Sequence, residues 1–244
     1  IEVEGNDIIL MLDVSGSMQL FDDLKDTRSR FDVAKQEALN FIRSRNHDPI
    51  GLILFGATAI SRCPVTLDKA ILEEILYKLE LGEIDSEGTV LAVGLGMAVN
   101  RLRFSQSTSK VIILLTDGAP SEQDIDPAPV LTLAKKYGIK VYTIGVGGKD
   151  GGYGFIQPHG LVHFKTPLNE ELLKKIADET GGESFLAEKP EDIQSIYKKI
   201  DALEKKSYDM PLYARYNELF FPFVLAALFL LCCEIIIRWY RVIV

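Results

Sequence analysis

Short apolar runs alternate with longer amphipathic segments along most of the chain. Residues 8–12, 50–55 and 111–115 form such runs, each too short for a buried helix and without the polar alternation of a half-exposed strand. Continuous apolar runs of this length are typical of strands buried on both faces of a parallel sheet. The pattern therefore predicts an α/β fold built on a central sheet.

Three more strands and the covering helices follow from the same pattern. Strands are expected at 59–65, 140–146 and 183–187. The turn before residue 59 is so short that strand 59–65 is predicted to be antiparallel and to lie at an edge. The spacing of apolar residues predicts helices at 31–42, 68–79, 89–103, 126–138, 169–181 and 190–206. Together these elements predict a Rossmann-like, doubly wound, mostly parallel six-stranded sheet with one antiparallel edge strand and helices on both faces.

A glycine-rich stretch at 147–160 follows the strand at 140–146 and has little apolar content. We expect a mobile surface loop there. Its place after the carboxyl end of a strand leaves two interpretations open. It is either a solvent-exposed hairpin or an element near the functional edge of the sheet that shapes the choice of partner.

The C-terminal part of the chain differs from the rest. No charged residue occurs from 219 through 233, and after Glu234 the apolar run resumes. Aromatic residues flank the run at both ends, as in the aromatic belts of membrane spans. We therefore predict a transmembrane helix at 219–241, a juxtamembrane linker at 207–218 and a folded domain at 1–206. Two arginines after the run favour a cytoplasmic C-terminus, which places the folded domain outside the cytoplasm.

Composition and charge argue against nucleic-acid binding, and the cysteine spacing argues against a zinc site or a disulfide framework. A chain of 244 residues is long enough for one substantial core, and its formal net charge is -8. The sequence has neither a basic stripe nor a Lys/Arg-rich run, so nucleic acid is not an expected partner. The three cysteines, Cys63, Cys232 and Cys233, lack the spacing of a zinc site or of a disulfide framework.

Hydroxyl and carboxylate side chains follow two of the buried strands. Asp13, Ser15 and Ser17 come directly after the first strand, and Asp117 follows the fourth. Thr89 offers a further hydroxyl just after a glycine. Because the carboxyl ends of parallel strands meet at one edge, these oxygens are expected to form a cluster suited to a hard divalent cation. Taken one at a time, the same residue types also form ordinary turns and helix caps.

With all five residues in this order, the sequence resembles the von Willebrand factor type A family. The metal-ion-dependent adhesion site (MIDAS) of that family has the pattern D-x-S-x-S, then Thr, then Asp. The resemblance implies that Ser15, Ser17 and Thr89 bind Mg²⁺, or Mn²⁺ or Ca²⁺, through their hydroxyls, whereas Asp13 and Asp117 act largely through bound waters. It also implies that an acidic residue of a partner protein completes the coordination, and that the protein binds without catalysis.

Several stretches narrow the resemblance to the bacterial BatA group, the von Willebrand A membrane proteins of the aerotolerance operon. They are 30–35, 63–68, 109–118 and 142–147, together with the C-terminal anchor. The resemblance implies two upstream membrane spans and a location in the bacterial inner membrane, with the domain in the periplasm. It further implies a complex with other Bat-type proteins and a MoxR-type AAA+ ATPase, in stress tolerance or protein assembly. The segment 119–122 departs from the asparagine-rich loop that such proteins often have, so partner specificity does not carry over there.

Two other functions stay open at this stage. A metal-dependent hydrolase would also use Mg²⁺ at the edge of an α/β sheet, but the sequence has neither a G-x-x-x-x-G-K-[ST] phosphate loop nor a G-x-S-x-G elbow. A membrane-tethered scaffold would use the metal only to hold the fold together. The three histidines, His47, His159 and His163, fall outside the metal motif.

Overall fold

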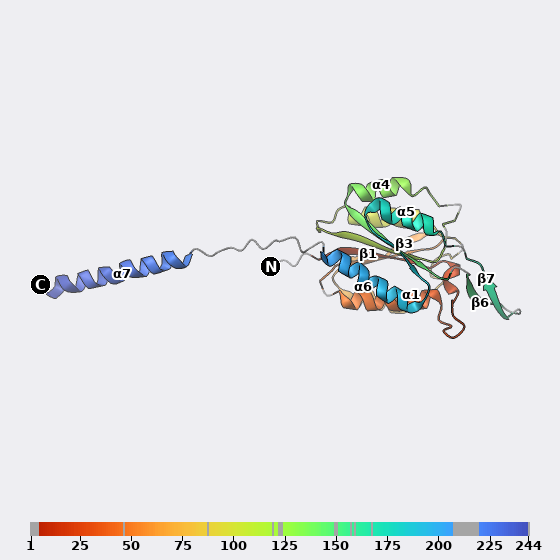
Figure 1. Ribbon diagram of the computed structural model, residues 1–244, viewed down its shortest axis with the longest axis horizontal. Coiled ribbons are helices and arrows are strands. Elements are labelled where there is room, and N and C mark those ends of the chain that lie inside the picture. Colours follow the sequence, from red (N-terminus) through yellow and green to blue (C-terminus); the bar gives the residue numbers. More distant parts are fainter. Residues whose placement is uncertain are drawn as a thin grey trace. The chain divides into compact units, whose positions relative to one another are not determined.

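The chain divides into two compact units, Ile1–Glu204 and Lys205–Val244. Figure 1 shows the sheet and its covering helices in the first unit. The computed structural model describes residues 5–45, 47–86, 88–118, 120–121, 124–148, 151–156, 158, 160–166, 168–206 and 220–243. The sequence-predicted metal ligands all belong to the first unit.

A six-stranded sheet forms the centre of the first unit, with the strand order β3-β2-β1-β4-β5-β8. All neighbouring strands pair in parallel except β2 and β3, so the predicted mostly parallel sheet with one antiparallel edge strand is confirmed. The strands are β1 (Asp7–Asp13), β2 (Ile50–Phe55), β3 (Ala59–Thr66), β4 (Lys110–Thr116), β5 (Ile139–Val146) and β8 (Ser184–Ala187).

The register of the central strands brings the polar residues after β1 and β4 together. In this register Leu12 on β1 pairs with Leu115 on β4. Asp13 therefore lies level with the end of β4, and Asp117 follows one residue beyond that strand. Because the two strands run in the same direction, both carboxylates emerge at the same edge of the sheet.

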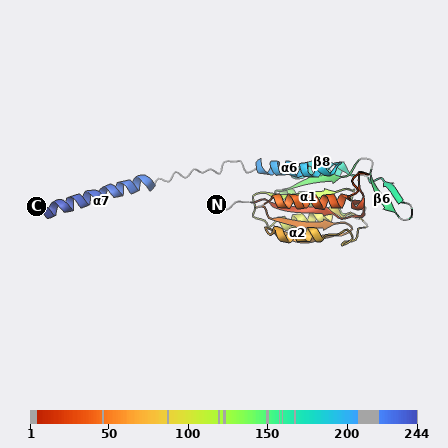
Figure 2. The same cartoon turned by 90° about the horizontal axis from the view of Figure 1, so that it is seen from below.

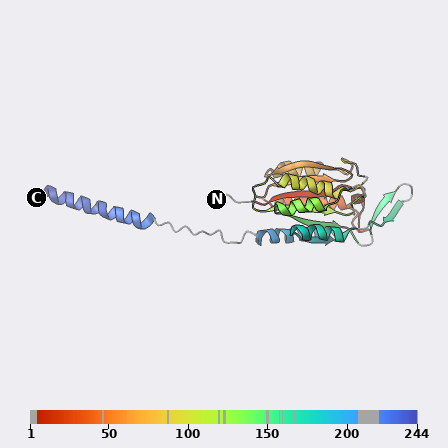
Figure 3. The same cartoon turned by 90° about the horizontal axis from the view of Figure 1, so that it is seen from above.

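In the part of the chain that the structure describes, three helices pack on each face of the sheet. Both faces are apolar because successive residues of a buried strand point to opposite faces. Helices α1 (Arg30–Ser44), α2 (Lys69–Lys78) and α6 (Pro190–Lys206) pack on one face, which Figure 2 shows. Helices α3 (Leu91–Leu102), α4 (Ala128–Lys136) and α5 (Glu170–Thr180) pack on the other, seen in yellow to teal in Figure 3. The predicted doubly wound arrangement is thus confirmed.

Local capping explains where several helices begin and end. The Asp68 side chain accepts a hydrogen bond from the backbone N–H of Ile71 at the start of α2. Asn169 caps α5 in the same way. Helix α5 ends at Gly181, whose φ of 79° is a left-handed conformation that favours glycine. These sequence-predicted boundaries are confirmed.

The glycine-rich stretch contains more regular structure than a loop. Strands β6 (Gly152–Ile156) and β7 (Gly160–Phe164) form an antiparallel hairpin of their own. The stretch therefore forms a hairpin, as one of the two interpretations predicted, and residues 152–156 are strand rather than loop. The hairpin is also docked, because the backbone of Tyr153 on β6 pairs with that of Phe21.

The second unit contains helix α7 (Phe220–Ile243). The predicted linker at 207–218 lies outside the described residues. Over the residues that the structure describes, no helix is both long enough and apolar enough to cross a membrane. The transmembrane helix expected at 219–241 is therefore not confirmed.

Candidate metal centre

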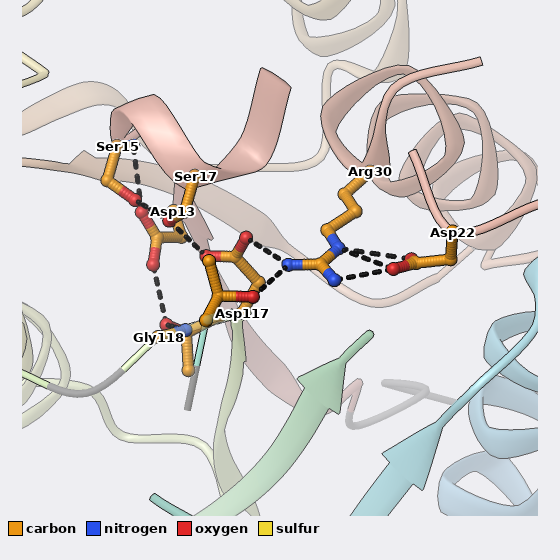
Figure 4. Close-up of polar contacts among 9 residues, drawn as sticks. Asp13, Ser15, Ser17, Asp22, Arg30, Asp117 and Gly118 are labelled. Atoms are coloured by element: carbon orange, nitrogen blue, oxygen red, sulfur yellow. Dashed lines mark hydrogen bonds and ion pairs between the residues drawn. The ribbon is translucent and has the colours of Figure 1, made fainter. Parts of the chain in front are cut away.

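Asp13 is fixed at the end of β1 by hydrogen bonds to both of its carboxylate oxygens. Its Oδ1 accepts from the backbone N–H of Ser15 at 2.8 Å. Its Oδ2 accepts from the hydroxyl of Thr116 on β4 at 2.5 Å. The Asp13 side chain is fully buried. The carboxylate therefore occupies one defined position between two neighbouring strands, as Figure 4 shows.

Ser15, Ser17 and Asp117 form a continuous cluster of oxygen atoms beside Asp13 (Figure 4). The short helix η1 (Gly16–Gln19) turns the chain after β1, and the hydroxyls of Ser15 and Ser17 lie 3.1 Å apart. The Ser17 hydroxyl donates to Oδ1 of Asp117 at 2.6 Å, although the two residues are 100 positions apart in the sequence. The structure thus brings together four of the five sequence-predicted ligands.

Thr89, the fifth predicted ligand, reaches the same edge through its backbone. Its carbonyl accepts a hydrogen bond from the backbone N–H of Ser121 at 3.0 Å, in the loop after β4. The next residue, Val90, donates to the carbonyl of Gly56, in the loop after β2. The preceding segment is also held there, since the carbonyl of Ser86 accepts from Gly16. The Thr89 segment therefore packs between the loops that follow β1, β2 and β4.

Arg30, which the sequence did not single out as a site residue, completes the cluster. Its Nη1 donates to Oδ2 of Asp117 at 2.9 Å and to the Thr166 hydroxyl at 3.1 Å. Its Nε and Nη2 bind the carboxylate of Asp22 (Figure 4). The guanidinium therefore connects the cluster with the chain that follows η1.

The sequence does contain a signal for Arg30. A cation is unfavourable in the first turn of a helix, because the N-terminus carries the positive end of the helix dipole. Arg30 is the first residue of α1, directly after the N-cap Ser29 and within the capping box that Ser29 forms with Asp32. A capped helix that starts with arginine indicates that the charge is satisfied elsewhere. Only the fold shows that Asp117 satisfies it.

The negative charges of the two buried carboxylates in the cluster are only partly compensated by nearby groups. Asp13 and Asp117 expose 0% and 1% of their surface. Burial raises the pKa of Asp13 to about 7. The charge of Asp117 adds to this shift, and hydrogen bonds from Ser15 and Thr116 oppose it. Burial also raises the pKa of Asp117, although Ser17 and Arg30 stabilise its charged form. A cation bound beside them would relieve this cost.

The residues fit a small, hard divalent cation. All predicted donors are oxygen atoms, the ligand type that Mg²⁺ prefers. Neighbouring ligands of an octahedral Mg²⁺ lie about 2.9 Å apart, given metal–oxygen distances near 2.0–2.1 Å. The 3.1 Å between the two serine hydroxyls and the 2.6 Å from Ser17 to Asp117 lie on either side of that value. Within the described part of the chain, no group of three or more His, Cys, Asp or Glu residues could hold a metal, and this site would use only two carboxylates.

Comparison with known sequences gives both a family and distant relatives. The profile of the von Willebrand factor type A domain matches residues 7–199. An uncharacterized protein of Borreliella burgdorferi is 30% identical over 185 residues, which are 73% of this chain and 52% of that protein. A UPF0353 protein of Nocardia farcinica is 27% identical over 215 residues, 82% of this chain and 62% of that protein. The chain thus spans between half and two thirds of the length of these curated relatives.

Solved structures give the same picture of the fold. An aerotolerance-related membrane protein from Bacteroides fragilis matches with a TM-score of 0.68 and 25% identity, over 83% of this chain and 100% of that one. The conserved hypothetical protein BatB from Bacteroides thetaiotaomicron matches with a TM-score of 0.67 and 23% identity, over 82% and 100%. Proximal thread matrix protein 1 from the mussel byssus, with a zinc-occupied MIDAS motif, has a TM-score of 0.59 and 16% identity over 82% and 48%. The last two show similarity of fold alone.

Proposed function

Because the chain belongs to the von Willebrand factor type A domain family, we propose that it binds a partner protein through a divalent cation. Asp13, Ser15, Ser17, Thr89 and Asp117 would hold the cation, for which Mg²⁺ is the first candidate and Mn²⁺ or Ca²⁺ the alternatives. An aspartate or glutamate of the partner would complete the coordination. The function is adhesion between proteins, without catalysis.

The hydrogen bond between Ser17 and Asp117 supports this proposal most directly. It joins the loop after β1 to the loop after β4 at 2.6 Å, at the edge where α/β sheets bind ligands. Asp117 is almost fully buried, whereas Ser17 is only half-buried. The oxygen cluster is therefore held from inside the fold and is partly exposed at Ser17.

The charge of the cluster suits an acidic partner. Ser15, Ser17 and Thr89 are neutral, and Arg30 already neutralises one oxygen of Asp117. When bound, Mg²⁺ supplies a positive charge with water positions that a carboxylate can take. Arg30 keeps the Asp117 carboxylate in one orientation, so that its Oδ1 stays on the side of Ser17.

We further propose that the protein acts in association with a membrane, in a complex with other Bat-type proteins and a MoxR-type ATPase in stress tolerance or protein assembly. The first support is the sequence resemblance to the BatA group. The second is the neighbour from Bacteroides fragilis, which is described as an aerotolerance-related membrane protein. Partner capture tests this part of the proposal together with the metal site.

Calorimetric titration of the full chain with MgCl₂ tests the metal site. We expect saturable binding by the unchanged protein and at least about tenfold weaker binding by Asp13→Asn, because the substitution removes a charge beside the cation. Asp178→Asn is the matched control, because it makes the same substitution at an exposed position of α5. Its affinity for Mg²⁺ should equal that of the unchanged protein. Equal Mg²⁺ affinity in all three proteins would contradict the assignment.

Affinity capture from solubilised membranes, with Mg²⁺ or with EDTA, tests the adhesive function. Partners identified by mass spectrometry should be retained in Mg²⁺, lost in EDTA and lost with Asp13→Asn, but kept with Asp178→Asn. If Mg²⁺ binds but the same partners are captured in every arm, the cation has a structural role and the adhesive function is wrong.

A further inference from the structure

The β6–β7 hairpin is attached to the chain that follows residues 13–17, which form the metal loop after β1. The backbone N–H of Phe21 donates to the carbonyl of Tyr153 at 3.0 Å, and the N–H of Tyr153 donates back at 2.8 Å. The ring centroid of Phe21 lies 6.1 Å from that of Tyr153 and 5.9 Å from that of Phe155. Figures 1, 2 and 3 all show the hairpin projecting beyond the edge of the sheet. It therefore stands beside the candidate metal centre as a wall.

A groove of about 690 Å³ lies between this wall and the metal loop. Gly16 and Ser17 line it at the metal loop, and Phe155 and Phe164 line it on the hairpin. Its volume is within the usual range of about 300–1,000 Å³ for ligand sites. Because Ser17 belongs to both, a chain segment bound in the groove can reach the candidate metal centre.

The described side chains that line the groove include no charged group. They are Ser17, Gln19, Leu20, Phe21, Thr27, Phe155, Phe164 and Thr166, besides two glycines. A second cavity of about 570 Å³, which Arg30 lines, is bordered mostly by charged side chains, together with a few aliphatic ones. The groove therefore favours apolar and aromatic groups, whereas a carboxylate is favoured only where a cation is bound.

Phe155 is the exposed aromatic group of this wall. It is 73% exposed, and the only ring contact that the described residues give it is with Phe21. Aromatic side chains on a protein surface often carry much of the energy of a protein interface, because they bury a large area with little loss of conformational freedom. Phe155 is thus placed to contact a bound segment next to the residue that reaches the metal.

We propose that this groove selects the partner, and that its occupant is a partner protein segment in which an acidic residue is adjacent to an aromatic or branched aliphatic one. The acidic residue completes the coordination of the cation at Ser17, and its apolar neighbour packs against Phe155. This inference rests on the proposed adhesive function and adds the chemistry of the partner to it.

A bead library of short peptides, each with a fixed central aspartate and random flanks, provides the probe. The labelled full chain should retain beads in Mg²⁺ but not in EDTA, with aromatic and branched aliphatic flanks enriched. Phe155→Ser should weaken binding of the enriched peptides about tenfold, while peptides with serine and glycine flanks change little. The matched control is Phe104→Ser, because Phe104 is equally exposed, at 71%, and lies after α3 rather than in the groove.

The outcomes separate this inference from the function on which it rests. Two results would overturn the proposed role of the groove and leave metal-dependent binding intact. One is retention that requires Mg²⁺ and aspartate but shows no preference for the flanking residues. The other is a flank preference that Phe155→Ser leaves unchanged. Absence of any Mg²⁺-dependent retention by the unchanged protein overturns both. Equal losses with Phe155→Ser and Phe104→Ser also overturn the groove, because they show a general effect of removing a surface aromatic.

Discussion

Arg30 carries a full charge with only 2% of its surface exposed. Burial of a charged group is costly unless partners surround it, and Asp117, Asp22 and Thr166 accept from its three nitrogens. Removing one member of a buried pair leaves the other charge uncompensated, which costs far more than the loss of a surface pair. Arg30 therefore contributes strongly to the geometry of the cluster, because it holds Asp117 from the side opposite Ser17.

We expect Arg30→Met to lower the free energy of unfolding by about 3 kcal/mol, because Asp117 would stay buried without a counter-charge. Arg28→Met is the matched control, since Arg28 pairs with Asp26 at 2.6 Å but is 54% exposed. Its loss should cost below about 1 kcal/mol. Urea unfolding in EDTA measures both values. Similar small losses for the two variants would contradict the role assigned to Arg30.

At the scale of elements, the β6–β7 hairpin is positioned by close backbone contacts at its base. Gly151 has a φ of 99°, and a Cβ there would lie 1.9 Å from the carbonyl oxygen of Phe164. No side chain fits that space without moving the backbone. The hairpin thus depends on glycine to stay in register and to keep Tyr153 paired with Phe21.

Gly151→Ala is expected to loosen the hairpin without unfolding the sheet. The backbone amides of Phe21 and Tyr153 should exchange hydrogen about tenfold faster, because their mutual hydrogen bonds open more often. Gly160→Ala is the control. Gly160 also has a positive φ, of 77°, but an added Cβ there would have nothing within 4 Å, so this variant changes the backbone preference without adding a close contact. Hydrogen exchange with mass spectrometry makes the comparison. Equal exchange in the two variants would show that the close contact with Phe164 is unimportant.

At the scale of the whole domain, a buried acid fastens the last helix to the sheet. Glu204 on α6 accepts hydrogen bonds from Tyr142 at 2.6 Å, Ser109 at 2.7 Å and Lys140 at 2.9 Å. Burial by itself would raise the pKa of Glu204, but these hydrogen bonds outweigh burial and lower it. The ionised carboxylate therefore stabilises the folded domain.

Glu204→Gln is expected to lower the free energy of unfolding by about 2 kcal/mol at pH 7, because hydrogen bonds to a charged acceptor are replaced by weaker ones. A lowered pKa gives stability that is complete above the usual value of about 4.3 and is lost as the pH falls through the value in the fold. The difference between the two proteins should thus shrink below about pH 4. Thermal melting across pH measures it, with the exposed Glu179→Gln as control. A difference independent of pH would contradict the ionised form.

Much of the domain follows from its sequence. Buried strands and amphipathic helices are fixed by local spacing of apolar residues, so the six-stranded sheet, its antiparallel edge strand and its covering helices were predicted correctly. Parallel pairing also makes strand ends converge, which is why the sequence predicts that Asp13, Ser15, Ser17 and Asp117 lie together. These features depend on short-range patterns and on one general rule of sheet geometry.

Tertiary structure alone decided the rest. The contact of Arg30 with Asp117 spans 87 positions, and the docking of Tyr153 on Phe21 joins a glycine-rich hairpin to a distant loop. No periodic pattern in the sequence predicts either contact, because each depends on the directions in which two loops leave the sheet. The sequence determined which oxygens gather at the edge of the sheet. The packing of loops determined which charge balances them and which groove lies beside them.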